Sequence, residues 1–374
     1  MVAVEKFIDR FAGKILCESA GVLKRKQTFN NPKNLLFVKL WAVGESILVL
    51  PLIEQSKRAF PDCKISVLCR KRNVAAFTDL SFIDELLVLE DINVFKYFKA
   101  FDLVFDCEPY LNISSILSRT MGRFVVGFSH GSRAKLYDMK VAYNDDQHVA
   151  LTYLDLLKEF HEVQVPKDLV RLGFKEEDLS FAKDFLKNRG LLDKKLVGVC
   201  AGVAESSASR MWPSSNFSEL ADVLVEKGFT VLFTGTKDQR ELNNGIISQT
   251  KNKNSILNIA GDTSLKQLFA LMGFFDLFVS VDTGPMHIAA AQGVPTVGLF
   301  CPNTPVRFGP YGSKNSFVYK PVLEKPCINV HLGEVPDCEA HNHMSKISVD
   351  DVLEKMKLPI AAELRGITLK RMES

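Results

Sequence analysis

The amino-acid sequence predicts an α/β protein made of two doubly wound domains that face each other across a cleft. Short, almost continuously apolar runs alternate with helical stretches, and this alternation occurs twice along the 374 residues. Strands covered by helices on both faces are apolar throughout, and parallel strands need crossover helices. Of the residues, 47% are hydrophobic and 24% are charged, which is enough apolar material for two cores. Ligands of such sheets bind beyond the carboxyl ends of the strands, so we expect the site in the cleft.

The first alternation predicts an N-terminal domain over residues 34–175, preceded by an extension at 1–33. After the first strand, a helical stretch is expected at 46–60, ending at Pro61. Residues 129–175 are more polar and less regular, as in a connector. The strands expected in this domain are 34–40, 64–69, 85–89, 101–106 and 123–128.

The second alternation predicts a C-terminal domain over residues 176–347. A charged helix is expected at 175–188. The strands expected after it are 195–200, 229–234, 276–281, 296–300 and 316–319. Residues 348–374 are expected to form a helix and a tail, with Ser348 as the N-cap ahead of two acidic residues.

The first residues of the chain have apolar side chains at helical spacing. Acidic and basic residues interrupt them, so we expect no signal peptide here, and no apolar run reaches the ~18 residues that span a bilayer. The apolar positions are Val4, Phe7, Ile8, Phe11, Ile15 and Leu16. Two interpretations stay open: a helix docked on the protein itself, or a basic amphipathic helix, residues 1–26, on an anionic membrane surface.

Charge and cysteine content exclude several classes of protein. The formal net charge is +3 and no basic block with aromatic residues occurs, so we expect no nucleic-acid partner. The eight cysteines are scattered, as in a cytoplasmic protein with reduced thiols. We expect no metal at the main site. One Cys/His group matches no common zinc pattern, so it is either a polar surface segment or a metal site: Cys327, His331, Cys338, His341 and His343.

The stretch with the most chemistry is 276–312. A hydrophobic strand ends at Asp282, a tight turn follows, and a helix is expected to begin near Met286. Free N–H groups at such a helix start bind phosphate, and Gly284 lets the backbone approach a ligand. Pro285 suits a first helical turn, and His287 can donate to a phosphate or a sugar hydroxyl. The alternative is a purely structural turn in which acidic and hydroxyl side chains cap the helix.

This stretch resembles the signature of glycosyltransferase family 9, the ADP-heptose:lipopolysaccharide heptosyltransferases. Three parts of that signature occur here in order: DTGPMH at 282–287, AAAQGVP at 289–295 and GPYG at 309–312. The resemblance implies that the turn holds the diphosphate and the adjacent sugar of a donor. The contacts it implies are Asp282, Thr283, Gly284, Met286 and His287.

Three further segments resemble the donor side of the family. Gly202 ends a strand, and Arg210 stands in SRMWP where the family has K-x-W-P, so the resemblance implies a cation that neutralises the leaving diphosphate. Arginine keeps the charge of lysine but not its geometry. The alternative is a solvated arginine ahead of a packed tryptophan. The resemblance implies that Asp238 binds the ribose hydroxyls of the donor and that Thr263 lines the pocket for its adenine.

The segment 36–51 resembles the family's first strand, turn and helix, where a G-D pair supplies the proposed catalytic base. Gly44 and Glu45 occupy that place, so the carboxylate is one methylene longer than in the family. Glu45 is either the base or a helix-start carboxylate favoured by the helix dipole. Asp106 and Glu108, after another strand, are the alternative bases.

Together these segments cover residues 34–345 and imply the GT-B architecture, with two Rossmann-like domains. They imply an inverting transfer that needs neither metal nor cofactor. The partners implied are a nucleotide-sugar donor, ADP-heptose, and a lipopolysaccharide-core or other cell-surface glycan acceptor. Such an enzyme is expected in the cytoplasm, with peripheral contact to the inner face of the cytoplasmic membrane as an option. The alternatives are a different nucleotide sugar, or a catalytically weak sugar-nucleotide-binding protein.

Overall fold

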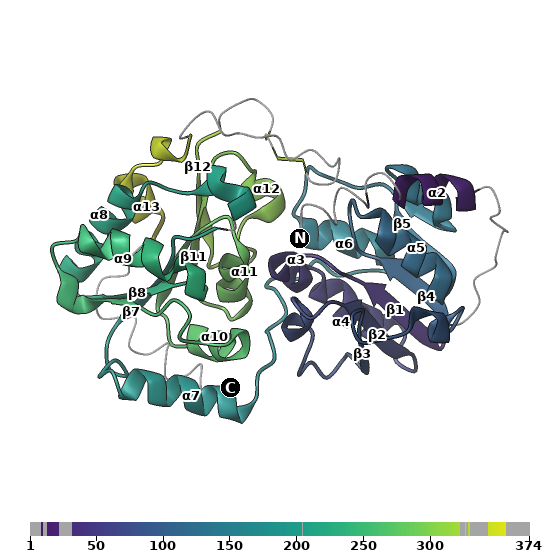
Figure 1. The fold of residues 1–374 in the computed structure, drawn as a ribbon, viewed down its shortest axis with the longest axis horizontal. Coiled ribbons are helices and arrows are strands. Elements are labelled where there is room, and N and C mark those ends of the chain that lie inside the picture. The colour runs from purple at the N-terminus through teal and green to yellow at the C-terminus, as the bar shows by residue number, and fades with distance from the viewer. Residues whose placement is uncertain are drawn as a thin grey trace. The chain divides into compact units, whose positions relative to one another are not determined.

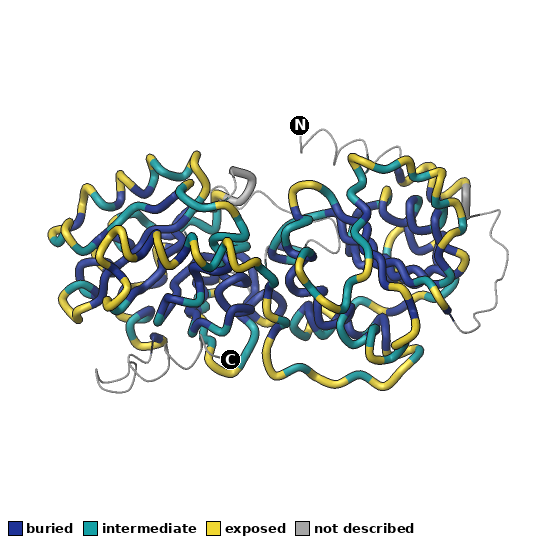
Figure 2. The backbone as a smooth tube through the Cα atoms, turned by 90° about the horizontal axis from the view of Figure 1, so that it is seen from below, coloured by how far each residue is buried: buried dark blue, intermediate teal, exposed yellow. Residues whose placement is uncertain are grey.

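The structure is a computed structural model that describes residues 9, 13–21, 32–203, 205–321, 326, 328–329 and 343–356. The chain divides between Pro166 and Lys167 into two compact units, and Asn329 is grouped with the first of them. Each unit contains one six-stranded sheet with helices packed against it (Figure 1), which confirms the α/β class. In Figure 2 the dark blue, buried backbone lies at the centre of each unit, and the central strands of both sheets consist mostly of buried residues.

The sheet of the first unit is parallel throughout, with the strand order β3-β2-β1-β4-β5-β6. The strands are β1 (Asn34–Val38), β2 (Lys64–Cys69), β3 (Glu85–Val88), β4 (Phe101–Asp106), β5 (Gly122–Phe128) and β6 (Met139–Val141). The α-helices are α2 (Lys14–Gly21), α3 (Val43–Leu48), α4 (Leu50–Ala59), α5 (Asn112–Met121) and α6 (Val149–Lys158). Short 3₁₀ helices are η2 (Val74–Ala76), η3 (Val94–Tyr97) and η4 (Ser132–Leu136).

The second sheet is also parallel, with the order β12-β11-β10-β7-β8-β9. Its strands are β7 (Leu196–Cys200), β8 (Thr230–Thr234), β9 (Ile256–Asn258), β10 (Leu277–Val281), β11 (Thr296–Phe300) and β12 (Ser316–Tyr319). The α-helices are α7 (Glu176–Lys187), α8 (Ser214–Glu226), α9 (Arg240–Ser248), α10 (Leu265–Met272), α11 (Gly284–Ala291), α12 (Pro305–Phe308) and α13 (Val349–Met356). The 3₁₀ helices are η5 (Glu205–Arg210), η6 (Lys237–Gln239), η7 (Lys253–Ser255) and η9 (His343–Lys346).

Each strand order reverses once, and the reversal defines where a ligand would bind. In the first sheet the chain runs from β1 outward to β3 and then returns to β4, on the other side of β1. In the second sheet it runs from β7 to β9 and returns to β10, beside β7. Crevices form at such switch points, beyond the carboxyl ends of the two flanking strands. The loops after β1, β4, β7 and β10 are therefore the places to look for functional side chains.

Two sequence expectations were wrong in detail. The helix expected at 46–60 is two helices, α3 and α4, with a break at Val49. Pro51 lies at the start of α4 and has no N–H for the preceding turn, so the helix restarts there. The connector expected over 129–175 contains β6 and the apolar helix α6, most of whose residues are buried. Strand β9, only three residues long, was not expected either.

The C-terminal helix begins as the sequence indicates. The Ser348 hydroxyl accepts a hydrogen bond from the Asp351 N–H at 3.1 Å, and the Asp351 carboxylate accepts one from the Ser348 N–H at 2.9 Å. This reciprocal pair is a capping box. The backbone hydrogen bond lowers the pKa of Asp351, and the ion pair with Lys320 adds to this effect.

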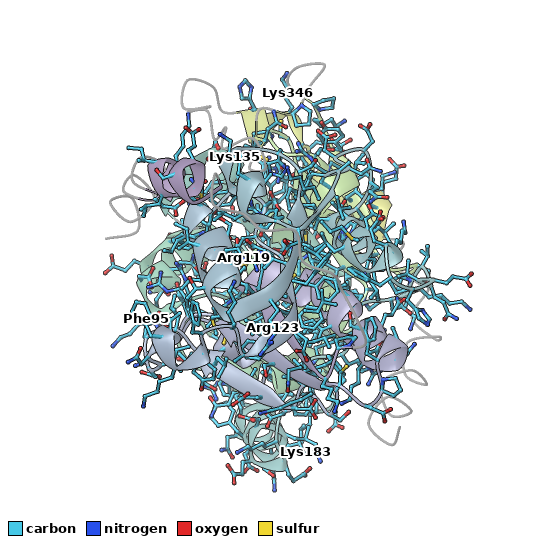
Figure 3. All side chains as sticks on the ribbon, turned by 90° about the vertical axis from the view of Figure 1, so that its right-hand side faces the viewer. Phe95, Arg119, Arg123, Lys135, Lys183 and Lys346 are labelled. Atoms are coloured by element: carbon cyan, nitrogen blue, oxygen red, sulfur yellow. The ribbon has the colours of Figure 1, made fainter. Side chains whose placement is uncertain are left out.

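Part of the N-terminal extension packs on the first unit. The Asp9 carboxylate accepts hydrogen bonds from the N–H groups of Asn112 and Ile113 and so caps α5. Cys17, on α2, lies 3.3 Å from the Ser115 hydroxyl. Figure 3 shows Lys135 beside α2, where its ammonium lies 3.8 Å from Glu18. Residues 13–21 are thus docked on the protein, while the rest of the expected helix, at 1–8, 10–12 and 22–26, lies outside the described residues.

Candidate active site

A buried lysine organises the end of β1. Lys39 is completely buried, and its Nζ lies 2.6 Å from Glu45 Oε2 and 3.4 Å from Glu108 Oε2. The other oxygen of Glu108 accepts hydrogen bonds from the N–H groups of Leu40 and Trp41, at 2.6 and 2.7 Å. Glu108 therefore joins the loop after β4 to the loop after β1, across the switch point of the sheet.

The charges of Lys39, Glu45 and Glu108 shift the pKa values of Lys39 and Glu108. Burial alone would lower the pKa of Lys39, but the carboxylates of Glu108 and Glu45 outweigh it, and the net effect raises this pKa. Burial raises the pKa of Glu108, and the ammonium of Lys39 opposes that rise. Lys39 therefore stays protonated and holds the Glu45 carboxylate in a fixed place.

Glu45 lies in the first turn of α3, where the helix dipole favours a carboxylate. It is not the N-cap, because that residue is Ala42, which has a φ of 57°. Its carboxylate instead contacts the Lys39 ammonium and, at 3.4 Å, the Tyr153 hydroxyl. A simple helix-start role would not require these partners, so the geometry favours a positioned functional group.

The two alternative carboxylates are inaccessible. Asp106 and Glu108 are both completely buried, whereas the Glu45 side chain is 15% exposed. Asp106 accepts hydrogen bonds from the hydroxyls of Tyr137 and Ser114, at 2.6 and 2.9 Å. Burial raises the pKa of Asp106. Of these three carboxylates, Glu45 alone can meet a substrate without rearrangement of the unit.

Removing the lysine is expected to destabilise the fold. Lys39→Met should lower the free energy of unfolding by about 3–5 kcal/mol, because it leaves Glu108 as an uncompensated buried charge. Chemical denaturation followed by circular dichroism measures this value. The double variant Lys39→Met/Glu108→Gln removes that charge, and we expect it to recover about half of the loss. An unfolding free energy of Lys39→Met within about 1 kcal/mol of the wild type would contradict the ion-pair account.

In the second unit, Asp282 follows β10 and connects two neighbouring loops. Its carboxylate lies 3.1 Å from Arg210 Nη1 and accepts a hydrogen bond from Asn303 Nδ2 at 2.7 Å. Arg210 Nη1 also donates to the backbone oxygen of Asp282 at 3.2 Å. Arg210 Nε is buried and has no hydrogen-bond partner among the described residues. The Arg210 side chain as a whole is 20% exposed, so an anionic ligand can reach part of the guanidinium.

The turn after Asp282 has an accessible part and a buried part. Helix α11 begins at Gly284, two residues earlier than expected, with Thr283 as its N-cap. Thr283 and Gly284 are partly exposed, whereas Met286 and His287 are buried. A Cβ added to Gly298 of β11 would lie 2.8 Å from the sulfur of Met286, so Met286 packs closely on the sheet. Direct ligand contact is therefore easiest at Thr283 and Gly284.

The other donor-side candidates lie at the same edge of this sheet. Gly202 follows β7, Asp238 follows β8 in η6, and Thr263 follows β9. Because β10, β7, β8 and β9 are parallel neighbours, their carboxyl ends share one edge with Asp282. Asp238 is exposed, Thr263 is partly exposed and Gly202 is buried.

Sequence reasoning missed Lys39 and Asn303. Lys39 was counted within the expected strand 34–40, although β1 ends at Val38. Asn303 lies three residues beyond β11, next to β10 in the sheet, so strand adjacency would have pointed to it.

The described residues contain neither a candidate metal site nor a helix that could span a membrane. Within them, no three His, Cys, Asp or Glu side chains are grouped so that they could hold a metal ion. Of the expected Cys/His group, only His343 is included, because Cys327, His331, Cys338 and His341 lie outside the description. No helix in the same part of the chain is long and apolar enough to cross a membrane.

The chain is similar in sequence to a family model and to individual proteins that are all described as heptosyltransferases. The model of a family described as glycosyltransferase family 9 (heptosyltransferase) matches residues 98–332. The lipopolysaccharide core heptosyltransferase OpsX of Haemophilus influenzae is 25% identical over 354 residues, covering 87% of this chain and 96% of that protein. Lipooligosaccharide heptosyltransferase 2 of Campylobacter jejuni is 23% identical over 317 residues, covering 84% and 94%.

Solved structures share the fold. A family 9 glycosyl transferase from Veillonella parvula has a TM-score of 0.73 and 23% identity, covering 91% of this chain and 98% of that one. The ADP-heptose lipopolysaccharide heptosyltransferase II of Escherichia coli has a TM-score of 0.66 and 20% identity, covering 91% and 100%. The two parallel six-stranded sheets thus form the expected GT-B-like fold.

Proposed function

The chain belongs to glycosyltransferase family 9, the heptosyltransferases, and on that premise we propose that it transfers heptose from ADP-heptose to a lipopolysaccharide- or lipooligosaccharide-core acceptor. The names of two relatives support heptose as the sugar and a lipopolysaccharide or lipooligosaccharide core as the acceptor. ADP-heptose is the donor named for the Escherichia coli structure. The observation that carries the proposal is the turn after β10, in which the signature residue Asp282 is paired with Arg210. The wider acceptor class that we propose includes other cell-surface glycans of similar chemistry.

The proposed reaction needs a base and a cation. An acceptor hydroxyl attacks the anomeric carbon with inversion, and the Glu45 carboxylate takes the hydroxyl proton. The bond to the diphosphate breaks as the new glycosidic bond forms, and ADP leaves. Arg210 and the backbone at Thr283 and Gly284 stabilise the charge that develops on the diphosphate. Asp238 and Thr263 would hold the ribose and the adenine. This mechanism assigns no step to a metal ion.

Two features motivate alternative functions. Arginine in place of the family's lysine at 210 is a reason to consider a different sugar nucleotide as the donor. The longer side chain of Glu45 is a reason to consider a sugar-nucleotide-binding protein with little turnover. A panel of ADP-, UDP- and GDP-sugars separates these cases, with thermal stabilisation reporting binding and nucleotide release reporting turnover. We expect ADP-heptose to give the largest response in both. Preference for another nucleotide, or binding without release, would select one of the alternatives.

We also propose peripheral membrane contact through α2, at the inner face of the cytoplasmic membrane. The side chains of Ile15 and Leu16 are 65% and 55% exposed although α2 itself is docked. Exposed apolar side chains on a helix can insert at a lipid interface. Such contact would bring the enzyme to a lipid-linked acceptor.

The membrane proposal predicts a loss of vesicle binding in Ile15→Ser/Leu16→Ser. Co-flotation with phosphatidylglycerol vesicles should fall about tenfold, because two apolar side chains no longer insert. A deletion would be less informative, because it removes Asp9, which caps α5. The control is Val165→Ser/Leu192→Ser, which changes exposed apolar residues elsewhere. Equal flotation of wild type and the α2 variant would refute the proposal.

A further inference from the structure

Gln239 connects two loops at the ligand-binding edge of the second sheet. Its side-chain Nε2 donates a hydrogen bond to the backbone oxygen of Val203, in the loop after β7, at 3.2 Å. Its Oε1 accepts one from the N–H of Thr236, in the loop after β8, at 3.1 Å. Both loops follow the carboxyl ends of adjacent strands, so one carboxamide fixes the spacing between them.

Two glycines make room for this carboxamide. A Cβ added to Gly202 would lie 2.5 Å from the side-chain carbonyl carbon of Gln239. A Cβ added to Gly235 would lie 2.8 Å from its Oε1. Any larger side chain at Gly202 or Gly235 would therefore push Gln239 out of place. The closeness of Gln239 explains physically why residue 202 is a glycine. The resemblance to a sequence motif gives no such explanation.

The connected loops carry the residues proposed to bind the donor. The loop after β7 leads through η5 to Arg210, and the loop after β8 contains Asp238, immediately before Gln239. Arg210 is in turn paired with Asp282, after β10. The loops after three adjacent strands are thus joined by two side-chain bridges, one at Gln239 and one at Arg210.

We propose that Gln239 is a positioning residue that holds the loops after β7 and β8 together and thereby sets the affinity for the donor nucleotide. This inference rests on the proposed function. The hydrogen bonds of Gln239 reach Val203 and Thr236 rather than Arg210 or Asp282, so its loss should weaken donor binding more than it slows the chemical step.

Three variants of the full-length protein test the bridge. Gln239→Ala removes both hydrogen bonds. Gln239→Glu keeps an acceptor for the Thr236 N–H but cannot donate to the Val203 oxygen, so it removes the inter-loop bond and also adds a negative charge. Gln239→Ala removes the inter-loop bond without adding a charge. The matched control is Gln249→Ala, at the opposite end of α9, where the lost hydrogen bond goes to Gly245 in the same helix.

For each variant we would measure the dissociation constant of ADP by calorimetry, together with KM and kcat for ADP-heptose. In Gln239→Ala and Gln239→Glu we expect the ADP dissociation constant and the donor KM to rise about tenfold, because both variants lack the inter-loop hydrogen bond to Val203, with kcat within about threefold. Gln249→Ala should match the wild type in all three values.

The outcomes separate this inference from the proposed function. Wild-type donor KM and ADP affinity in Gln239→Glu would overturn the inference, because capping of η6 alone would then suffice. A fall in kcat at unchanged KM would overturn it as well. If the wild type neither binds ADP nor consumes a sugar nucleotide, the proposed function itself fails, and the inference fails with it.

Discussion

Glu45→Gln is expected to lower kcat by about 10²–10⁴-fold, with the donor KM changed less than threefold. The amide cannot take the proton of the acceptor hydroxyl, whereas the residues proposed to bind the donor belong to the other unit of the chain. Lys39 retains Glu108 as an ion-pair partner in this variant, so the unit should still fold. Steady-state release of ADP at saturating acceptor measures the effect, and calorimetry with ADP confirms that donor binding survives.

Two further variants sharpen the test of Glu45. Glu45→Asp shortens the side chain to the family's carboxylate, and we expect a kcat between those of wild type and Glu45→Gln, because the base is retained but withdrawn from Lys39. Glu54→Gln is the matched control, because Glu54 is a solvent-accessible carboxylate of α4 paired with Arg58. An unchanged kcat in Glu45→Gln would remove Glu45 from the mechanism and favour a binding protein or a different base.

Arg210→Ala is expected to lower kcat by about 10²–10³-fold. In the proposed mechanism the guanidinium supplies a positive charge at the leaving diphosphate, and removal of one such stabilising group typically costs this much. Arg210→Lys restores the charge and the family's residue, so we expect it to recover part of the rate. The same ADP-release assay measures all variants.

A second possibility for Arg210 is that it only neutralises Asp282. Asp282 is 5% exposed and lies 3.1 Å from the guanidinium, so the single variant leaves a nearly buried carboxylate without its cation. The double variant Arg210→Ala/Asp282→Asn removes this unpaired charge. If Arg210 acts on the diphosphate, kcat in the double variant stays as low as in Arg210→Ala. Recovery to wild-type kcat would assign Arg210 a purely structural role.

The long apolar strands were the most predictable part of the fold. The strands β2, β4 and β11 have the boundaries that their apolar runs indicate, and so does the four-residue edge strand β12. Strands buried on both faces have a clear sequence pattern. Short elements such as β9 and β6 have only three residues each, too few for such a pattern. Their conformation depends on the neighbouring strand that they extend.

The chemistry of the donor turn could be expected from the sequence because its residues are consecutive. The pairing of these residues with side chains from other loops was not predicted, because it depends on which strands are neighbours in the sheet. Asn303, which donates to Asp282, lies in the loop after the neighbouring strand β11. The hydrogen bond between Gln239 and Val203, outside this turn, links residues 36 positions apart and was not expected either. Lys39 was harder still, because a completely buried lysine is rare and its two carboxylates become visible only in three dimensions.

The sequence leaves three candidates for the catalytic base, Glu45, Asp106 and Glu108, and the structure favours Glu45. Asp106 and Glu108 are buried, and Glu45 is the partly exposed carboxylate held by Lys39. The extra methylene of glutamate reaches this ammonium, which is a physical reason for a longer side chain in this chain. Whether the acceptor then meets the carboxylate is what the Glu45 variants measure.

The most direct test of the central claim is product analysis with purified full-length protein, ADP-heptose and a heptose-deficient lipopolysaccharide core. Mass spectrometry of the acceptor and quantitation of ADP give the stoichiometry, and NMR gives the anomeric configuration of the product. We predict one heptose added for each ADP released, with inverted configuration. Intact ADP-heptose and an unmodified acceptor, under conditions where the protein is folded, would contradict the account.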